Sequence, residues 1–183
     1  MNTKRLSEKM EAALSEQMNN EMFNSQIYLS YGIWADDQGY SGVANLLWRH
    51  SQEERDHMIK FMNYTLNRGG KPQVSAIRQP GEEPKSLKDC FEKIFKYEVQ
   101  NTENIYKIVD LAFEEKDWAS WNFLQWFVKE QIEEETLAMD FLDKLEIAGG
   151  DRAKDESLLE LDKMFGQMAD EAELARDTDS ENP

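Results

Sequence analysis

The chain has 183 residues, and its 37 acidic and 21 basic residues give it a formal net charge of −16. This length suits one domain with a sizeable core. The negative charge argues against nucleic acid and anionic membranes as partners, whereas it attracts cations. The single cysteine, Cys90, excludes an internal disulfide framework and a metal site built from four thiolates of one chain.

The sequence lacks the apolar runs of targeting and membrane segments. Residues 1–15 alternate charged and apolar side chains, which is not the pattern of a signal peptide. No stretch approaches the roughly 18 uninterrupted apolar residues of a membrane-spanning helix. We therefore expect a cytoplasmic protein.

Two long helices are expected in the first half of the chain. The first covers 6–36, and a short turn at 37–40 makes the second, at 41–68, antiparallel to it. Three of the four prolines then fall within 69–85. Proline and glycine interrupt helices, so this stretch is predicted to be a connection without regular structure.

Two further long helices and a short one are expected in the second half. The third helix covers 86–116 and begins at the N-cap residue Ser86, and the fourth covers 117–148 and ends at two glycines. A shorter helix is expected at 155–174, opening with the capping-box pattern Ser157-x-x-Glu160. The domain boundary is placed at 175, and residues 176–183 are expected to form an acidic, disordered tail.

The lengths of the connections predict the topology. A helix of about 28 residues is roughly 42 Å long, and about 16 extended residues span roughly 50 Å. The 69–85 connection can therefore cross the whole bundle and leave the second and third helices parallel. The predicted fold class is an all-α four-helix bundle with a long crossover between helices 2 and 3 and a short fifth helix.

Five ionisable residues occupy the apolar stripes of these helices. Glu21, Glu54, His57, Glu98 and Glu134 lie in register with the core-facing positions. Buried carboxylates that lie this close cannot all stay ionised without a counter-charge, and a multivalent cation supplies one. No Lys or Arg shares these stripe positions, which argues against carboxylates that are merely paired for structure.

The residue types and their spacing indicate which cation is bound. Glu54 and His57 are three positions apart, so both face the same side of one helical turn. Glu54 is placed to bridge two ions, while Glu21 and Glu98 each complete one. Oxygen-rich ligation with one imidazole suits iron or manganese better than structural zinc. We interpret His50, one turn before Glu54, as a core or supporting residue.

Several motifs resemble the ferritins, and specifically the bacterial non-haem ferritins. The resemblance covers nearly the whole chain. The motifs are Ser-Glu-Gln-Met-Asn-Asn-Glu at 15–21, Arg-His-Ser-Gln-Glu-Glu-Arg-Asp-His-Met at 49–58, Tyr-Glu at 97–98 and Asn-Phe-Leu-Gln-Trp-Phe-Val-Lys-Glu-Gln-Ile-Glu-Glu-Glu at 122–135. A set of motifs in this order is highly specific.

The resemblance implies a role for each candidate residue. It assigns a first iron to Glu21, Glu54 and His57, a second iron to Glu54, Glu98 and Glu134 with Gln131 beside them, and a third iron to Glu53, Glu130, Glu133 and Glu134. It also places Tyr28 and Trp126 near the iron pair, where they supply electrons. By helix periodicity alone, Glu53, Glu130 and Glu133 read as a solvated acidic face, and Trp126 reads equally well as a core residue.

The implied function is iron storage with ferroxidase activity. Fe(II) is oxidised by dioxygen or peroxide, and Fe(III) is stored as a mineral inside a homo-oligomeric cage of 24 chains. The expected fifth helix matches the one that packs around the four-fold axis of such a cage. No haem is expected, because haem-binding relatives carry a methionine where this chain has Arg55. The long acidic tail departs from the family pattern.

Three alternatives use a similar bundle. A rubrerythrin-like peroxidase normally adds a small iron domain with two Cys-x-x-Cys pairs, which Cys90 alone cannot form. A Dps-like DNA-protecting shell lacks the fifth helix and builds its iron site between subunits. A structural or cytokine-like bundle binds no metal, and anaerobic Fe(II) titration separates it from the others.

Overall fold

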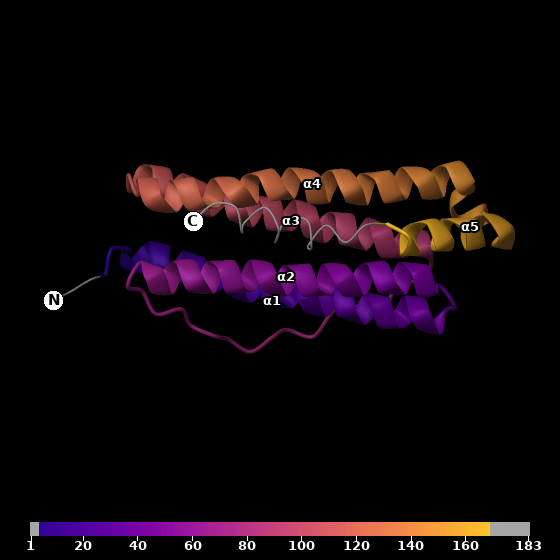
Figure 1. Cartoon of the computed structure of the whole chain (residues 1–183), viewed down its shortest axis with the longest axis horizontal. Coiled ribbons are helices and arrows are strands. Elements are labelled where there is room, and N and C mark those ends of the chain that lie inside the picture. The colour runs from indigo at the N-terminus through magenta and orange to yellow at the C-terminus, as the bar shows by residue number, and fades with distance from the viewer. Residues whose placement is uncertain (1–3, 169–183) are drawn as a thin grey trace.

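The computed structural model describes residues 4–168, and all regular secondary structure within them is helical. Four long helices lie side by side: α1 (Glu8–Asp37), α2 (Ser41–Asn67), α3 (Leu87–Glu114) and α4 (Trp118–Ala148) (Figure 1). A short 3-10 helix, η1 (Gly150–Arg152), and α5 (Asp155–Gly166) follow. The predicted all-α bundle with a fifth helix is confirmed.

Local sequence signals fix most helix ends. Ser7 caps α1 by accepting a hydrogen bond from the backbone N–H of Met10 at 3.0 Å. Ser86 caps α3 in the same way through the N–H of Asp89 at 3.2 Å, as predicted. Gly149 ends α4 in the left-handed region, with φ of 118°. These caps satisfy backbone groups that a helix end otherwise leaves without partners.

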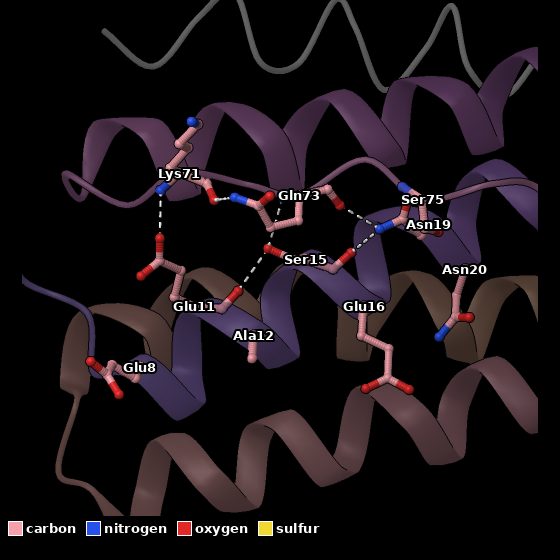
Figure 2. Close-up of a pocket in the computed structure, with 10 residues that line it drawn as sticks. All are labelled: Glu8, Glu11, Ala12, Ser15, Glu16, Asn19, Asn20, Lys71, Gln73 and Ser75. Atoms are coloured by element: carbon pink, nitrogen blue, oxygen red, sulfur yellow. Dashed lines mark hydrogen bonds between the residues drawn. The ribbon is translucent and has the colours of Figure 1, made fainter.

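The connection between α2 and α3 crosses the length of the bundle, so these two helices run parallel (Figure 1). Figure 2 shows how it is fastened to α1. The side chain of Asn19 donates to the carbonyl of Gln73 at 2.8 Å and accepts from the N–H of Ser75 at 2.9 Å. The N–H of Lys71 donates to Glu11 at 2.6 Å. The segment forms no helix or strand, and hydrogen bonds with α1 hold it in place instead.

The fifth helix begins at the predicted residue but is capped differently, and it ends earlier than predicted. It begins at Asp155 with Lys154 as N-cap and no capping side chain, so the capping box predicted at Ser157 was wrong. The N–H of Leu158 already bonds to the carbonyl of Lys154 at 3.0 Å, which places Ser157 inside the first turn. The helix ends at Gly166, and 169–174 lie outside the described residues. The tail at 176–183 also lies outside them, so the domain boundary stays a prediction.

Two glycines let α5 approach the start of α2. A Cβ on Gly42 would lie 1.9 Å from the carbonyl oxygen of Asp162, and one on Gly166 would lie 2.9 Å from the Cα of Gly42. The Asp162 carboxylate accepts a hydrogen bond from the N–H of Val43 at 2.9 Å. The N-cap residue of α2, Tyr40, makes no such side-chain bond. A residue of α5 therefore caps the first turn of α2.

The apolar core falls into two clusters with a band of buried polar residues between them. One cluster includes Tyr31 and Phe91 and is joined by Phe165 of α5, and the other includes Met10 and Phe61. The polar band crosses the middle of all four long helices. Within residues 4–168, no helix combines the length and apolar character needed to cross a membrane.

Candidate metal centre

The five ionisable stripe residues meet in the polar band. Glu21 comes from α1, Glu54 and His57 from α2, Glu98 from α3 and Glu134 from α4. Each is at most 7% exposed to solvent. All occur near mid-helix, so helices aligned along one axis bring them to the same depth. The helical periodicity that predicted them therefore also positions them.

Three of these residues already have the arrangement of a metal site. Ligand atoms of Glu21, Glu54 and His57 all lie within 4.8 Å of one another. The Nδ1 atom of His57 is 3.7 Å from Oε2 of Glu54. That Oε2 atom is buried and has no hydrogen-bond partner among the described residues. A buried carboxylate oxygen without a partner is costly, and a cation at this point would satisfy it.

The remaining two carboxylates face Glu54 from the other side of the bundle. Both Glu98 and Glu134 repel the charge of Glu54. Glu98 is held in place by two donors: the hydroxyl of Tyr28 donates to Oε1 at 2.6 Å, and the side-chain amide of Gln131 donates to Oε2 at 3.3 Å. Glu54 is therefore the carboxylate common to both halves of the site.

Burial favours the uncharged form of each of these groups. Burial and three neighbouring carboxylates raise the pKa of Glu54 well above its usual value, and burial also raises that of Glu21. The pKa of Glu98 rises to about 7 because of burial, although its hydrogen bonds with Tyr28 and Gln131 oppose the shift. Burial lowers the pKa of His57 to about 3. The imidazole therefore stays neutral and can act as a ligand.

Two amide side chains complete the site on the α1–α3 side. Gln17 donates to Oε1 of Glu21 and to Oδ1 of Asn101, both at 2.7 Å. Asn101 donates to Oε2 of Glu21 at 3.2 Å and to Gln131 at 3.3 Å. Neither amide was predicted from the sequence to be a site residue. The spacing could have found them, because Gln17 precedes Glu21 by one turn and Asn101 follows Glu98 by three residues.

A second group of potential ligands lies on the α2–α4 side. Ligand atoms of His50, Glu53 and Glu134 lie within 4.8 Å of one another, and so do those of Glu53, His57 and Glu130. Nδ1 of His50 is 3.4 Å from Glu53 and 3.8 Å from Glu134. Glu53 is 6% exposed, so helix periodicity was wrong in placing it on a solvated face. The packing of α4 beside this part of α2 buries it.

Glu133 belongs to neither of these groups. Its side chain is 53% exposed and pairs with Lys129 at 3.2 Å, one helical turn away. Of the four residues that the resemblance implied for a third iron, Glu53 lies with Glu134 in one group and with Glu130 in the other. His50, interpreted from its sequence position as a core or supporting residue, lies in the group with Glu53 and Glu134.

Two aromatic residues flank the centre, as expected. The ring of Tyr28 stacks on His50 with centroids 5.3 Å apart, and the ring of Trp126 meets the edge of His57 at 5.4 Å. The ammonium of Lys60 lies 4.1 Å above the Trp126 ring. Both aromatic side chains thus contact a histidine of the site.

The donor set suits iron. It offers carboxylate oxygens with one imidazole per group, which is the chemistry of hard or intermediate cations such as iron and manganese. Cysteine, the usual ligand of structural zinc, does not contribute, because Cys90 is buried in one of the apolar clusters.

Comparison with known proteins agrees with this geometry. A family described as "Ferritin-like domain" matches residues 11–148, which include every candidate ligand. The chain belongs to the ferritin family. A probable bacterial non-heme ferritin-like protein of Haemophilus influenzae is 41% identical to it over 167 residues, covering 91% of this chain and 99% of the relative. A bacterial non-heme ferritin of Escherichia coli is 37% identical over 136 residues, covering 74% and 82%.

Solved ferritin structures share the fold. A novel open pore ferritin from the hyperthermophilic archaeon Archaeoglobus fulgidus superposes with a TM-score of 0.86 at 37% sequence identity. The match covers 92% of this chain and 100% of that one. The resemblance to ferritins found in the sequence motifs is thus confirmed over both halves of the bundle.

Proposed function

We propose that this ferritin stores iron, and that it oxidises Fe(II) at a two-iron centre before storing Fe(III) as a mineral. Glu21, Glu54 and His57 bind the first iron, and Glu54, Glu98 and Glu134 bind the second. Family membership supports iron storage, while the convergence of these side chains supports the chemistry. Iron is here the substrate of the protein.

The observation that carries this proposal is the environment of Glu54. Its carboxylate is 2% exposed, one of its oxygens has no hydrogen-bond partner among the described residues, and three other carboxylates face it. In a purely structural core, such a group would destabilise the fold. When two cations are bound, the repulsion among the carboxylates is replaced by attraction, because each carboxylate then offsets positive charge.

The ligands suit the oxidation itself. Each Fe(II) gives up one electron. Dioxygen takes two electrons and two protons to form hydrogen peroxide, whereas hydrogen peroxide takes two electrons and its O–O bond breaks to give two hydroxide ions. Anionic oxygen ligands favour the more highly charged Fe(III) product. Tyr28 and Trp126 lie close enough to the centre to serve as further electron donors.

We also propose a third iron position on the α2–α4 side, held by Glu53, Glu130 and Glu134 with His50 in place of Glu133. This position shares Glu134 with the second iron, so an oxidised ion can leave the centre through it. The ring of His50 is fixed by its stack on Tyr28, which suits a ligand better than the exposed Glu133 side chain does.

Assembly into a hollow cage of 24 chains completes the proposal, because a mineral needs an enclosed volume. The presence of α5 supports such a cage over the Dps-like alternative. No haem is expected, since Arg55 is an exposed cation on α2 and has no thioether sulfur.

The test is an anaerobic titration of the iron-free protein with Fe(II), followed by rapid mixing with oxygenated buffer. We expect at least two tight Fe(II) ions per chain and an Fe(III) absorbance that develops within seconds. Tight binding without oxidation would leave a storage protein that lacks ferroxidase activity. A titration without tight binding would contradict the metal centre altogether.

A further inference from the structure

A polar pocket lies on the side of the metal centre away from the acidic α2–α4 group. It has a volume of about 310 Å³ and opens between α1, α3 and the crossover. Six of its lining side chains are primary amides: Asn20, Asn24, Gln79, Gln100, Asn101 and Asn104. None of the described residues that line it carries a carboxylate. Its one charged residue, Arg78, lies with its guanidinium carbon 4.0 Å from the ring centroid of Phe23.

One amide in this pocket lacks a partner. Asn24 is 6% exposed, and its Nδ2 atom is buried without a hydrogen-bond acceptor among the described residues. A buried N–H group without an acceptor costs about 1–3 kcal/mol. Asn24 is also one of the side chains that line the pocket. The site is thus built for a small molecule that hydrogen-bonds.

The pocket also reaches the metal ligands. Asn101 lines it and donates a hydrogen bond to Oε2 of Glu21 at 3.2 Å. Asn24 follows Glu21 by three residues on α1, so the two side chains lie one turn apart on the same face. A single layer of side chains therefore separates a molecule in the pocket from the first iron position.

We propose that this pocket binds hydrogen peroxide and supplies it to the metal centre. This inference rests on the proposed function and names the oxidant that this face admits. A pocket without carboxylates offers Fe(II) no counter-charge. Hydrogen peroxide is uncharged and both donates and accepts hydrogen bonds, so it can bond with both the NH2 and the C=O groups of the amide side chains.

The two sides of the centre would then admit different reactants. Iron approaches from the α2–α4 side, where Glu53 and Glu130 attract a cation, and peroxide approaches from the α1–α3 side. At the centre, two Fe(II) ions each give one electron to one H2O2. The O–O bond breaks, and two hydroxide ions and two Fe(III) ions result.

The test compares two oxidants in two matched variants. Asn24→Leu keeps the branched outline of the side chain, with a larger volume, but removes the amide. Asn63→Leu makes the same change at an exposed position on α2, outside the pocket. Each protein is loaded anaerobically with two Fe(II) per chain and mixed with hydrogen peroxide or with dioxygen. In Asn24→Leu we expect the peroxide rate to fall about tenfold or more and the dioxygen rate to change less than twofold. Asn63→Leu should match the wild type with both oxidants.

Several outcomes would overturn the proposal. An unchanged peroxide rate in Asn24→Leu, or an equal loss with both oxidants, would show that the pocket does not select peroxide. Oxidation of the wild type by dioxygen but not by peroxide would also overturn it while leaving the proposed function intact. Failure with both oxidants in the wild type would instead contradict the proposed function.

Two further measurements keep the test independent of folding and of bound iron. Asn24→Ser retains a small donor in the pocket, so we expect it to recover part of the peroxide rate. Crystals of the iron-free wild type soaked in hydrogen peroxide should show an elongated density within hydrogen-bond distance of Asn24, which crystals of Asn24→Leu should lack. Density for water only in the wild type would count against the proposal.

Discussion

The hydroxyl of Tyr28 donates a 2.6 Å hydrogen bond to the carboxylate of Glu98, linking α1 to α3 beside the metal centre. The pKa of Tyr28 lies well above its usual value because the ring is buried and the carboxylates of Glu98, Glu134 and Glu54 are close. The hydroxyl therefore stays protonated and keeps donating at physiological pH. On its other side, the Tyr28 ring stacks on His50.

The first prediction follows from this bond. Tyr28→Phe removes a donor to an anionic ligand, and such bonds contribute about 1.5–3 kcal/mol. We expect the second Fe(II) to bind about tenfold more weakly, while the first changes little. Anaerobic titration measures both affinities. Tyr31→Phe removes a hydroxyl in the neighbouring apolar cluster and should leave both unchanged. Equal weakening by the two variants would assign the effect to packing.

The second prediction concerns Glu54 as the bridge between the two irons. Glu54→Ala should abolish rapid oxidation of two Fe(II) per chain, because it removes a ligand of each ion. Glu53→Ala changes the adjacent residue, about 100° around the helix, and should leave the first oxidation largely intact. Stopped-flow absorbance distinguishes them.

The iron-free Glu54→Ala variant should still fold, since the substitution relieves repulsion among buried carboxylates. Circular dichroism of the iron-free variant checks this. Wild-type oxidation rates in Glu54→Ala, or the same loss in both variants, would refute the bridging role.

The third prediction separates two compositions of the third iron position. His50→Ala should remove binding of the third Fe(II) per chain, whereas Glu133→Ala should retain it, because Glu133 is exposed and paired with Lys129. Anaerobic calorimetric titration counts the ions in each variant. Loss of the third ion in Glu133→Ala but not in His50→Ala would support the ligands implied by the family resemblance instead.

The fourth prediction is the pH dependence of the iron-free protein. Burial raises the folded pKa of Glu98 to about 7 and raises that of Glu54 well above its usual value, so the folded state holds protons that the unfolded state has released. Between pH about 6.5 and 8, His57 is neutral in the folded state, where its pKa is about 3, and only partly protonated in the unfolded state, so it contributes less than the two carboxylates. Stability should therefore fall as pH rises through this window.

Thermal unfolding midpoints of iron-free protein measured across that window test the prediction, with Glu98→Gln as the variant expected to flatten the slope. Fe(II) affinity should change in the opposite direction and rise by up to about tenfold per pH unit for each proton displaced. A midpoint that increases from pH 6.5 to 8 would contradict the assignment.

The fifth prediction tests the seating of α5. Asp162→Ala removes the cap on Val43 and should cost about 1 kcal/mol of stability. If α5 helps to close a cage, the wild type should scatter light as a particle of several hundred kilodaltons, and the variant should release smaller species. Asp155→Ala changes an exposed residue of the same helix and serves as control. An intact particle with an unchanged unfolding midpoint in Asp162→Ala would show that this cap contributes neither to stability nor to assembly.

Much of the fold was predictable because its signals are local. Ser86 and Gly149 mark helix ends through hydrogen bonds and backbone angles within a few residues. The capping box at Ser157 failed for the opposite reason. The C-terminal half of α5 is held by contacts with α2 and the apolar core, and no pattern within the helix reports them.

The sequence by itself determined which residues form the candidate metal centre. A charge such as Glu54 in an apolar stripe is visible from helical periodicity, and its spacing from His57 indicates a shared ligand role. Only the tertiary structure decided which side chains surround those ligands. Glu53 is buried, Glu133 is exposed and Asn101 reaches Glu21 because of how α1, α3 and α4 pack, and packing between distant segments leaves no periodic signal in the sequence.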